Sequence, residues 1–236
     1  MTRLTVAAEV CEAFPGLAVA AVVAEGVDGQ ARWEETERLL ADVEAAAADG
    51  TWAAPEESDP LLASWQGAYR AFGTNPRRFR PSMDALARRL AKSGRLPRIG
   101  SAVDTYNAVS VSHHVPAGAF DLAAVRGDIA LRHAGEGEAF TPLGEPGTTE
   151  EARPGEVIYA DADGVLTRHW NHRDSDRTKV TPASRDILFL MEAVDHDAGR
   201  KAVTQAADRL AVLLAPRAAR VTPHLLDPAT PTATLR

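Results

Sequence analysis

The chain has 236 residues but only one cysteine, Cys11, so no disulfide can form within it. This excludes the disulfide-framed class of small secreted domains, and we predict a reducing, cytoplasmic location. No hydrophobic run approaches the roughly 18 residues that a membrane-spanning helix needs. The first residues also lack the basic and apolar blocks of a signal peptide. A chain of this length buries on the order of 70–75% of its unfolded surface, so we predict one stable domain without a structural metal.

Several motifs that mark enzyme classes are also missing. The sequence has no G-x-x-x-x-G-K phosphate loop, no G-x-G-x-x-G, no G-x-S-x-G and no second cysteine. These absences argue against nucleotide-dependent and thiol chemistry, and we predict no cofactor. His169, His172 and Asp174 have a spacing open to zinc, but no third histidine lies nearby, so we predict no metal site.

Basic residues are outnumbered, with 26 lysines and arginines against 33 acidic residues and a formal net charge of −7. An acidic chain is unsuited to coating nucleic acid indiscriminately, and we predict no DNA partner. The charge is nevertheless uneven. Residues 25–59 contain eleven acidic and two basic residues, whereas residues 77–98 contain eight basic residues and one acidic residue. The segment 77–98, called the basic segment below, can contact nucleic acid locally.

Periodicity and turn residues predict an α+β fold with helices early and last and sheet between them. Residues 17–24 form an all-apolar run of strand length. Further strands are expected at 128–133, 156–160, 165–169 and 186–194, and helices at 33–48, 59–72, 83–92 and 201–214.

Three portions of one domain are predicted along the chain. Residues 1–76 form an N-terminal α/β portion packed on a core of residues 77–196, and residues 197–236 form a C-terminal helix and tail. The tail from residue 215 contains several prolines with many threonines and alanines, which predicts poor order.

Two polar runs contain candidate site residues. In residues 104–116, Asn107 is suited to hydrogen-bond a substrate, and His113 or His114 to move a proton near neutral pH. The alternative is that Asn107 caps a turn and both histidines lie on the surface. Residues 169–179 contain almost every kind of hydrogen-bonding group, which indicates either the rim of a pocket or a self-paired loop.

A single carboxylate interrupts the apolar strand at 187–194. With the period of two, Glu192 shares a face with Leu188 and Leu190. A buried carboxylate must be paired, protonated or turned toward a polar cavity. Glu192 therefore either lies in a pocket or pairs with an arginine at the strand end.

The order of several sequence blocks resembles the B3/B4 domain of the bacterial phenylalanyl-tRNA synthetase β subunit. The blocks are residues 82–90, 102–109, 116–121, 127–138 and 157–161, within a similarity that extends over about 81–194. Freestanding B3/B4 proteins are more similar still, at residues 73–76, 80–82 and 170–176. The resemblance implies a B3/B4-like β-sandwich or mixed-sheet core flanked by helices. Nothing in the chain resembles the catalytic or anticodon-reading modules of the synthetase.

In the synthetase this domain is an editing site that hydrolyses tyrosine wrongly esterified to the phenylalanine tRNA. By resemblance, Asn107 falls where that site has an asparagine facing the substrate, and Glu192 falls near the family's glutamate. Tyr106 replaces a small threonine, and Gly118 replaces the editing histidine. These two departures imply a changed pocket, so tyrosine specificity is not carried over. Hydrolysis still needs only a positioned water and backbone N–H donors for the oxyanion.

We therefore predict a trans-acting deacylase of a mischarged tRNA that binds the acceptor end of an aminoacyl-tRNA. The predicted catalytic residues are Asn107, Glu192, His172 and Arg173. The predicted substrate-binding residues are Tyr106, His114, Gly118, Trp170, Asn171 and Asp174. The predicted tRNA-binding residues are Arg77, Arg78, Arg80, Arg88, Arg89, Lys92 and Arg95. Two alternatives are a noncatalytic module that binds tRNA or an amino acid, and a small-molecule hydrolase or ligand-binding protein without RNA.

Overall fold

The apolar run near the N-terminus is strand β2 (Ala18–Glu25), whose composition follows from its central position in a sheet. The computed structural model describes residues 1–195 and 197–236. In it, β2 lies between β11 (Arg220–Leu226) and β10 (Ile187–Ala193), and the sheet order is β11-β2-β10-β3. Alternate residues of β2, such as Val19 and Ala20, enter two different hydrophobic cores. Both faces of the strand are covered, so both must be apolar.

A second, six-stranded sheet has the order β12-β1-β4-β7-β8-β9, in which only β1 and β4 pair in parallel. Its strands are β1 (Arg3–Val6), β4 (Ile129–His133), β7 (Val157–Asp161), β8 (Gly164–Arg168), β9 (Arg173–Asp174) and β12 (Thr232–Thr234). A short hairpin pairs β5 (Ala139–Phe140) with β6 (Glu150–Glu151), and β3 (Ala117–Asp121) completes the four-stranded sheet. The helices are α1 (Ala8–Ala13), α2 (Glu34–Asp49), α3 (Pro60–Ala71), α4 (Ser82–Ser93), α5 (Ser101–His113) and α6 (Ala198–Leu214).

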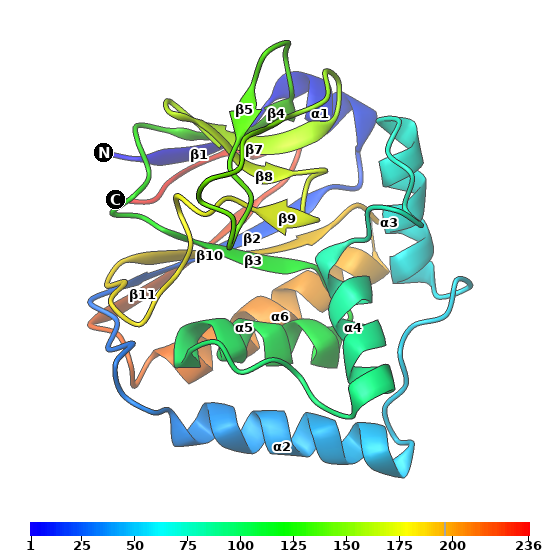
Figure 1. Ribbon diagram of the computed structural model, residues 1–236, viewed down its shortest axis with the longest axis vertical. Helices are drawn as coiled ribbons and strands as arrows, with labels where there is room; N and C mark the ends of the chain where they lie inside the picture. Colours follow the sequence, from blue (N-terminus) through cyan, green and yellow to red (C-terminus); the bar gives the residue numbers. More distant parts are fainter. Residues whose placement is uncertain (196) are drawn as a thin grey trace.

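These elements stack in layers, as Figure 1 shows: the six-stranded sheet, the four-stranded sheet, then α5 with α6, and α2 outermost. One hydrophobic core fills the space between the two sheets and contains Leu188, Leu190 and Trp170. A second core lies between the four-stranded sheet and the helices and contains Phe189 and Met191. Helix α4 lies beside α5 and close to the end of β3 (Figure 1).

The α+β class and the mixed-sheet core flanked by helices are confirmed. The five predicted strands appear as β2, β4, β7, β8 and β10, each within one or two residues of its expected bounds. Helix α5 was not expected, because its polar residues carry almost no amphipathic pattern. Ten of its residues are buried, polar ones included, so hydrophobic periodicity could not reveal it.

The C-terminal segment corrects one prediction. Residues 220–226 and 232–234 form strands β11 and β12 rather than a poorly ordered tail. Their backbone hydrogen bonds to β2 and β1 hold them in place, and Pro223 is tolerated because β11 is an edge strand. Strands from all three predicted portions therefore share sheets. The predicted boundary at residue 196 lies outside the described residues.

The residues at the starts of α3 and α4 use their side chains in different ways. The Asp59 side chain caps α3, because it accepts hydrogen bonds from the backbone N–H groups of Leu61 and Leu62, and Pro60 occupies the first helical position, where no N–H is needed. Ser82 is the first residue of α4 and does not cap that helix. Its hydroxyl instead lies 3.3 Å from both the backbone N and the backbone O of Ala117. Ser82 thus ties α4 to β3.

Within residues 1–195 and 197–236, none of the helices combines the length and the apolar character required to cross a bilayer.

Candidate functional site

Two adjoining cavities lie on either side of β3. The larger has a volume of about 670 Å³ and is walled by α4, α5, β3 and residues 179–182. The smaller, about 50 Å³, lies between the two sheets, and we call it the inner chamber. The cavities share the lining residues Ser82, Ala117, His172 and Asp174. A ligand in the large cavity can therefore extend a small group into the inner chamber.

Glu192 lines the inner chamber and is 2% exposed. Its Oε1 accepts hydrogen bonds from Trp170 Nε1 at 2.8 Å and from the Tyr159 hydroxyl at 2.5 Å. Its Oε2 accepts from Asn171 Nδ2 at 2.9 Å. Trp170 and Asn171 offer N–H groups that cannot accept, so this cage favours the ionised carboxylate. No cation of the described residues forms an ion pair with Glu192.

The cage depends on an outer residue, Tyr69 on α3. The Tyr69 hydroxyl donates to Asn171 Oδ1 at 2.8 Å, so the Asn171 amide must present its NH₂ group to Glu192. Burial raises the pKa of Glu192, and the hydrogen bonds from its three donors oppose that rise. The sequence singled out Trp170, Asn171 and Glu192. It did not single out Tyr69 or Tyr159, because a tyrosine among apolar neighbours has the pattern of core packing.

We expect Tyr69→Phe to lower the free energy of unfolding by about 1–2 kcal/mol, since it removes the hydroxyl that orients Asn171 and leaves a buried carbonyl oxygen unpaired. The Tyr106 hydroxyl makes no hydrogen bond to the described residues, so Tyr106→Phe is a matched control with an expected change within about 0.5 kcal/mol. Urea unfolding measures both. Equal losses in the two variants would contradict the orienting role of Tyr69.

Asp174 stands where the two cavities meet. Its carboxyl group makes no hydrogen bond to the described residues, and it is only partly buried. Burial, and then the nearby charge of Glu192, raise the pKa of Asp174 to about 7. A Cβ atom placed on Gly118 would lie 3.8 Å from Asp174 Oδ1. Because residue 118 has no side chain, the Asp174 carboxyl borders that space directly.

His172 is the second titratable group at this junction. Its Nδ1 lies 2.9 Å from the carbonyl oxygen of Arg80. A carbonyl can only accept, so Nδ1 carries the proton and Nε2 has the free lone pair. Burial lowers the pKa of His172, which keeps the ring neutral at pH 7. The neutral ring is suited to accept a proton from water.

The large cavity receives Tyr106 and Asn107 from consecutive positions of α5. Asn107 is 6% exposed, and its side chain makes no hydrogen bond to the described residues. It lies in the interior of the helix, so the alternative that it caps a turn is wrong. Ile99 and Leu143 form an apolar rim and are 61% and 45% exposed.

The structure does not bring two of the predicted site residues to the cavities. The Arg173 guanidinium pairs with Glu145 at 2.6 Å and lines neither cavity. His114 follows the last residue of α5, and its ring packs edge-on against Trp52 with the ring centroids 6.0 Å apart. Neither side chain is in position to contact a ligand in the cavities.

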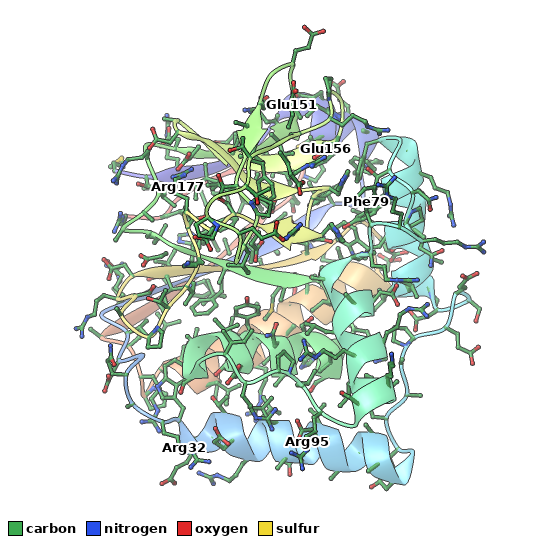
Figure 2. The ribbon with its side chains drawn as sticks, viewed as in Figure 1. Arg32, Phe79, Arg95, Glu151, Glu156 and Arg177 are labelled. Carbon is green, nitrogen blue, oxygen red and sulfur yellow. The ribbon has the colours of Figure 1, made fainter. Side chains whose placement is uncertain are left out.

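Some cations of the basic segment interact with other groups of the protein, and others do not among the described residues. The buried carboxylate of Asp84 binds Arg80 at 2.9 Å and Arg88 at 2.7 Å, so these two guanidinium groups are committed within the protein. Arg77 lies 3.7 Å from Glu57, and Arg78 lies over the Phe79 ring at 5.1 Å. Figure 2 shows Phe79 near α3, far from Arg95, which lies beside α2.

Arg89 lines the large cavity, and Lys92 is exposed one turn further along α4. Neither forms an ion pair with the described residues. Arg89 is therefore the cation that the basic segment places in the lining of the large cavity, and Lys179, which also lines it, pairs with Asp176 at 2.9 Å.

Two of the three residues weighed for a metal, His169 and His172, have other partners. His169 Nδ1 lies 2.9 Å from the Thr74 hydroxyl and 3.1 Å from Glu156 Oε2. Burial lowers the pKa of His169 to about 3. Within the part of the chain that the structure describes, no cluster of three or more histidine, cysteine or acidic side chains is placed to hold a metal ion.

Comparisons of sequence with known proteins agree with the resemblance described above. Residues 64–214 match the sequence profile of the B3/4 domain. The chain is similar to the phenylalanine–tRNA ligase beta subunit of Chromobacterium violaceum, with 35% identity over 109 residues, 46% of this chain and 13% of that protein. It is also similar to a crystal structure of an N-terminal fragment of the phenylalanyl-tRNA synthetase beta subunit from Pyrococcus horikoshii. That match has a TM-score of 0.47 and 15% identity, and covers 94% of this chain and 49% of the fragment.

Proposed function

Because the chain belongs to the B3/4 domain family, we propose that it is a trans-acting deacylase that hydrolyses the ester of a mischarged tRNA. The chain spans only 13% of the tRNA ligase subunit that it resembles. Its own pocket must therefore support the proposal. The observation that carries it is the junction of the two cavities, where Glu192 and Asp174 adjoin His172.

The two carboxyl groups favour an amino acid that carries N–H or O–H donors. Glu192 is buried with three neutral donors and no cation among the described residues. Taking such a charge out of water is costly unless an opposite charge or further donors meet it. An ammonium group in the inner chamber supplies both the opposite charge and further N–H donors. The large cavity then accommodates the apolar part of the substrate between Tyr106 and the rim.

The hydrolysis can be written with the groups at the junction. The oxygen of a water molecule attacks the ester carbonyl carbon while His172 Nε2 accepts one of its protons. The bond between the carbonyl carbon and the ribose oxygen then breaks, and that oxygen takes the proton back from His172. The products are the free amino acid and the uncharged tRNA. No cofactor enters this sequence.

The tRNA end reaches the cavity past Arg89 and Lys92. Contacts between a few cations and phosphates make binding strongly dependent on salt. We expect Arg89→Ala to weaken tRNA binding, whereas Arg32→Ala is a matched control because Arg32 lies at the start of α2, outside the basic segment (Figure 2). A cytoplasmic protein meets aminoacyl-tRNA freely, so we propose that location.

The deciding experiment offers the protein a panel of mischarged tRNAs and measures release of the amino acid. We expect release from at least one tRNA, and loss of that release in Asn107→Ala with tRNA binding retained. Salt-sensitive binding without release would identify a noncatalytic binding module instead. If no tRNA in the panel is bound or hydrolysed, the proposal fails and a function without RNA takes its place.

A further inference from the structure

One edge of the four-stranded sheet is open at the site. Among the described residues, strand β3 pairs with β10 on one side and with no strand on the other. Backbone hydrogen bonds run from Leu122 N to Asp186 O and from Glu192 N to Pro116 O, just beyond the two ends of the pairing. Because the two groups of an antiparallel residue point to the same side and successive residues alternate, the even-numbered residues of β3 bond to β10. The odd-numbered residues point their N–H and C=O groups away from β10.

Two of the three outward N–H groups have partners within the protein. Ala117 N lies 3.3 Å from the Ser82 hydroxyl, and Asp121 N donates to Thr178 O at 2.9 Å. Ala119 lies between them, and its N–H makes no hydrogen bond to the described residues. Ala119 is 4% exposed and lines the large cavity. A buried backbone N–H without a partner is rare and costly, which indicates that a ligand or water completes it.

The open edge is also the partition between the two cavities. Ala119 lines the large cavity, Gly118 and Phe120 line the inner chamber, and Ala117 lines both. A ligand that occupies both cavities must therefore cross the edge of β3. The small residues 117–119 leave the backbone there accessible to it.

We propose that the backbone N–H of Ala119 is a catalytic hydrogen-bond donor to the carbonyl oxygen of the scissile ester. This inference rests on the proposed deacylase function. When water adds to the carbonyl carbon, the electron pair of the C=O bond moves to the oxygen, and the Ala119 N–H donates to the resulting oxyanion. The charge collapses when the bond to the ribose oxygen breaks. A fixed backbone donor needs no reorganisation during this step.

The test replaces the amide at residue 119 by an ester, using the variant Ala119→lactic acid, which deletes the N–H and keeps the methyl side chain. Removal of one oxyanion donor is expected to lower kcat about 100-fold, with tRNA affinity unchanged. The matched control is Ala123→lactic acid. Its lost N–H donates to Asp121 Oδ1 outside both cavities, so wild-type kcat is expected.

A second variant guards against misfolding. Ala119→Pro deletes the same N–H on an edge strand, where proline does not interrupt the ladder. Wild-type kcat in either folded variant at residue 119 would overturn the inference while leaving the deacylase function intact. If the wild-type protein itself releases no amino acid from the panel, the proposed function fails, and this inference fails with it.

Discussion

Glu192→Gln is expected to slow deacylation strongly without destabilising the protein. The amide oxygen can keep the hydrogen bonds from Tyr159 and Trp170, and the Asn171 amide can turn over to accept from the new NH₂ group. Tyr69 then accepts from Asn171 instead of donating to it, since a hydroxyl does both. The buried charge is lost while the network survives. Because the uncompensated charge is costly, we expect Glu192→Gln to raise the melting temperature by a few degrees.

The rate should fall on the order of 100- to 1,000-fold in kcat/KM, the size of effect found when one member of a buried charge pair is removed. Glu192→Ala is the contrasting variant. It leaves two N–H groups and the Tyr159 hydroxyl without their acceptor, so we expect a loss of about 3–5 kcal/mol of stability. Calorimetry and single-turnover kinetics measure both quantities. If Glu192→Gln unfolds as readily as Glu192→Ala, the cage needs the carboxylate for stability. If its kcat/KM equals that of the wild type, Glu192 has no role in binding substrate.

The two variants are expected to change stability in opposite directions because of where Glu192 lies on β10. The same strand shows how much of the fold the sequence predicts. Period two correctly placed Glu192 on the same face as Leu188 and Leu190, and the doubly covered β2 was recognisable from its apolar run. Helix α5 and strands β11 and β12 could not be recognised in this way. Their polar and proline-containing sequences lack the periodicity and propensity of a helix or a strand, and tertiary contacts stabilise them instead.

The candidate site was partly predictable, because some of its residues break the local sequence pattern. Glu192 stands out because it interrupts an apolar strand, and Asn171 stands out as part of the polar run at 169–179. Arg173 is just as polar, but its partner Glu145 lies 28 positions away and only the fold pairs them. The Ala119 N–H has no side-chain signature at all. Its exposure to the cavity depends on which strand is left without a neighbour.

Asp174→Asn is expected to stabilise the protein increasingly as the pH rises from about 4 to about 7. The pKa of Asp174 is raised from 3.8 to about 7 in the folded state. The folded protein therefore holds this proton more tightly than the unfolded chain does. Its contribution to stability is complete below pH 3.8 and is lost as the pH rises through about 7. One pKa unit corresponds to about 1.4 kcal/mol, so the full effect is on the order of 4 kcal/mol above pH 7.

Asparagine has the shape of the neutral acid and does not ionise, so the melting temperatures of the two proteins should coincide near pH 4 and separate to a constant difference above pH 7. Thermal unfolding between pH 4 and 9 measures the separation.

The Asp174→Asn variant also tests the function. An ionised Asp174 beside Glu192 strengthens binding of an ammonium group, so kcat/KM of the wild type should rise through pH 7, and Asp174→Asn should lose that limb. Asp176→Asn is the control, because Lys179 and the Gly144 N–H lower the pKa of Asp176 and leave it ionised throughout this range. A stability difference that does not change with pH would show that Asp174 is not protonated in the folded protein. The charges of Glu192 and Asp174 would then not repel each other as proposed, and the argument that the inner chamber binds a cation would lose this support.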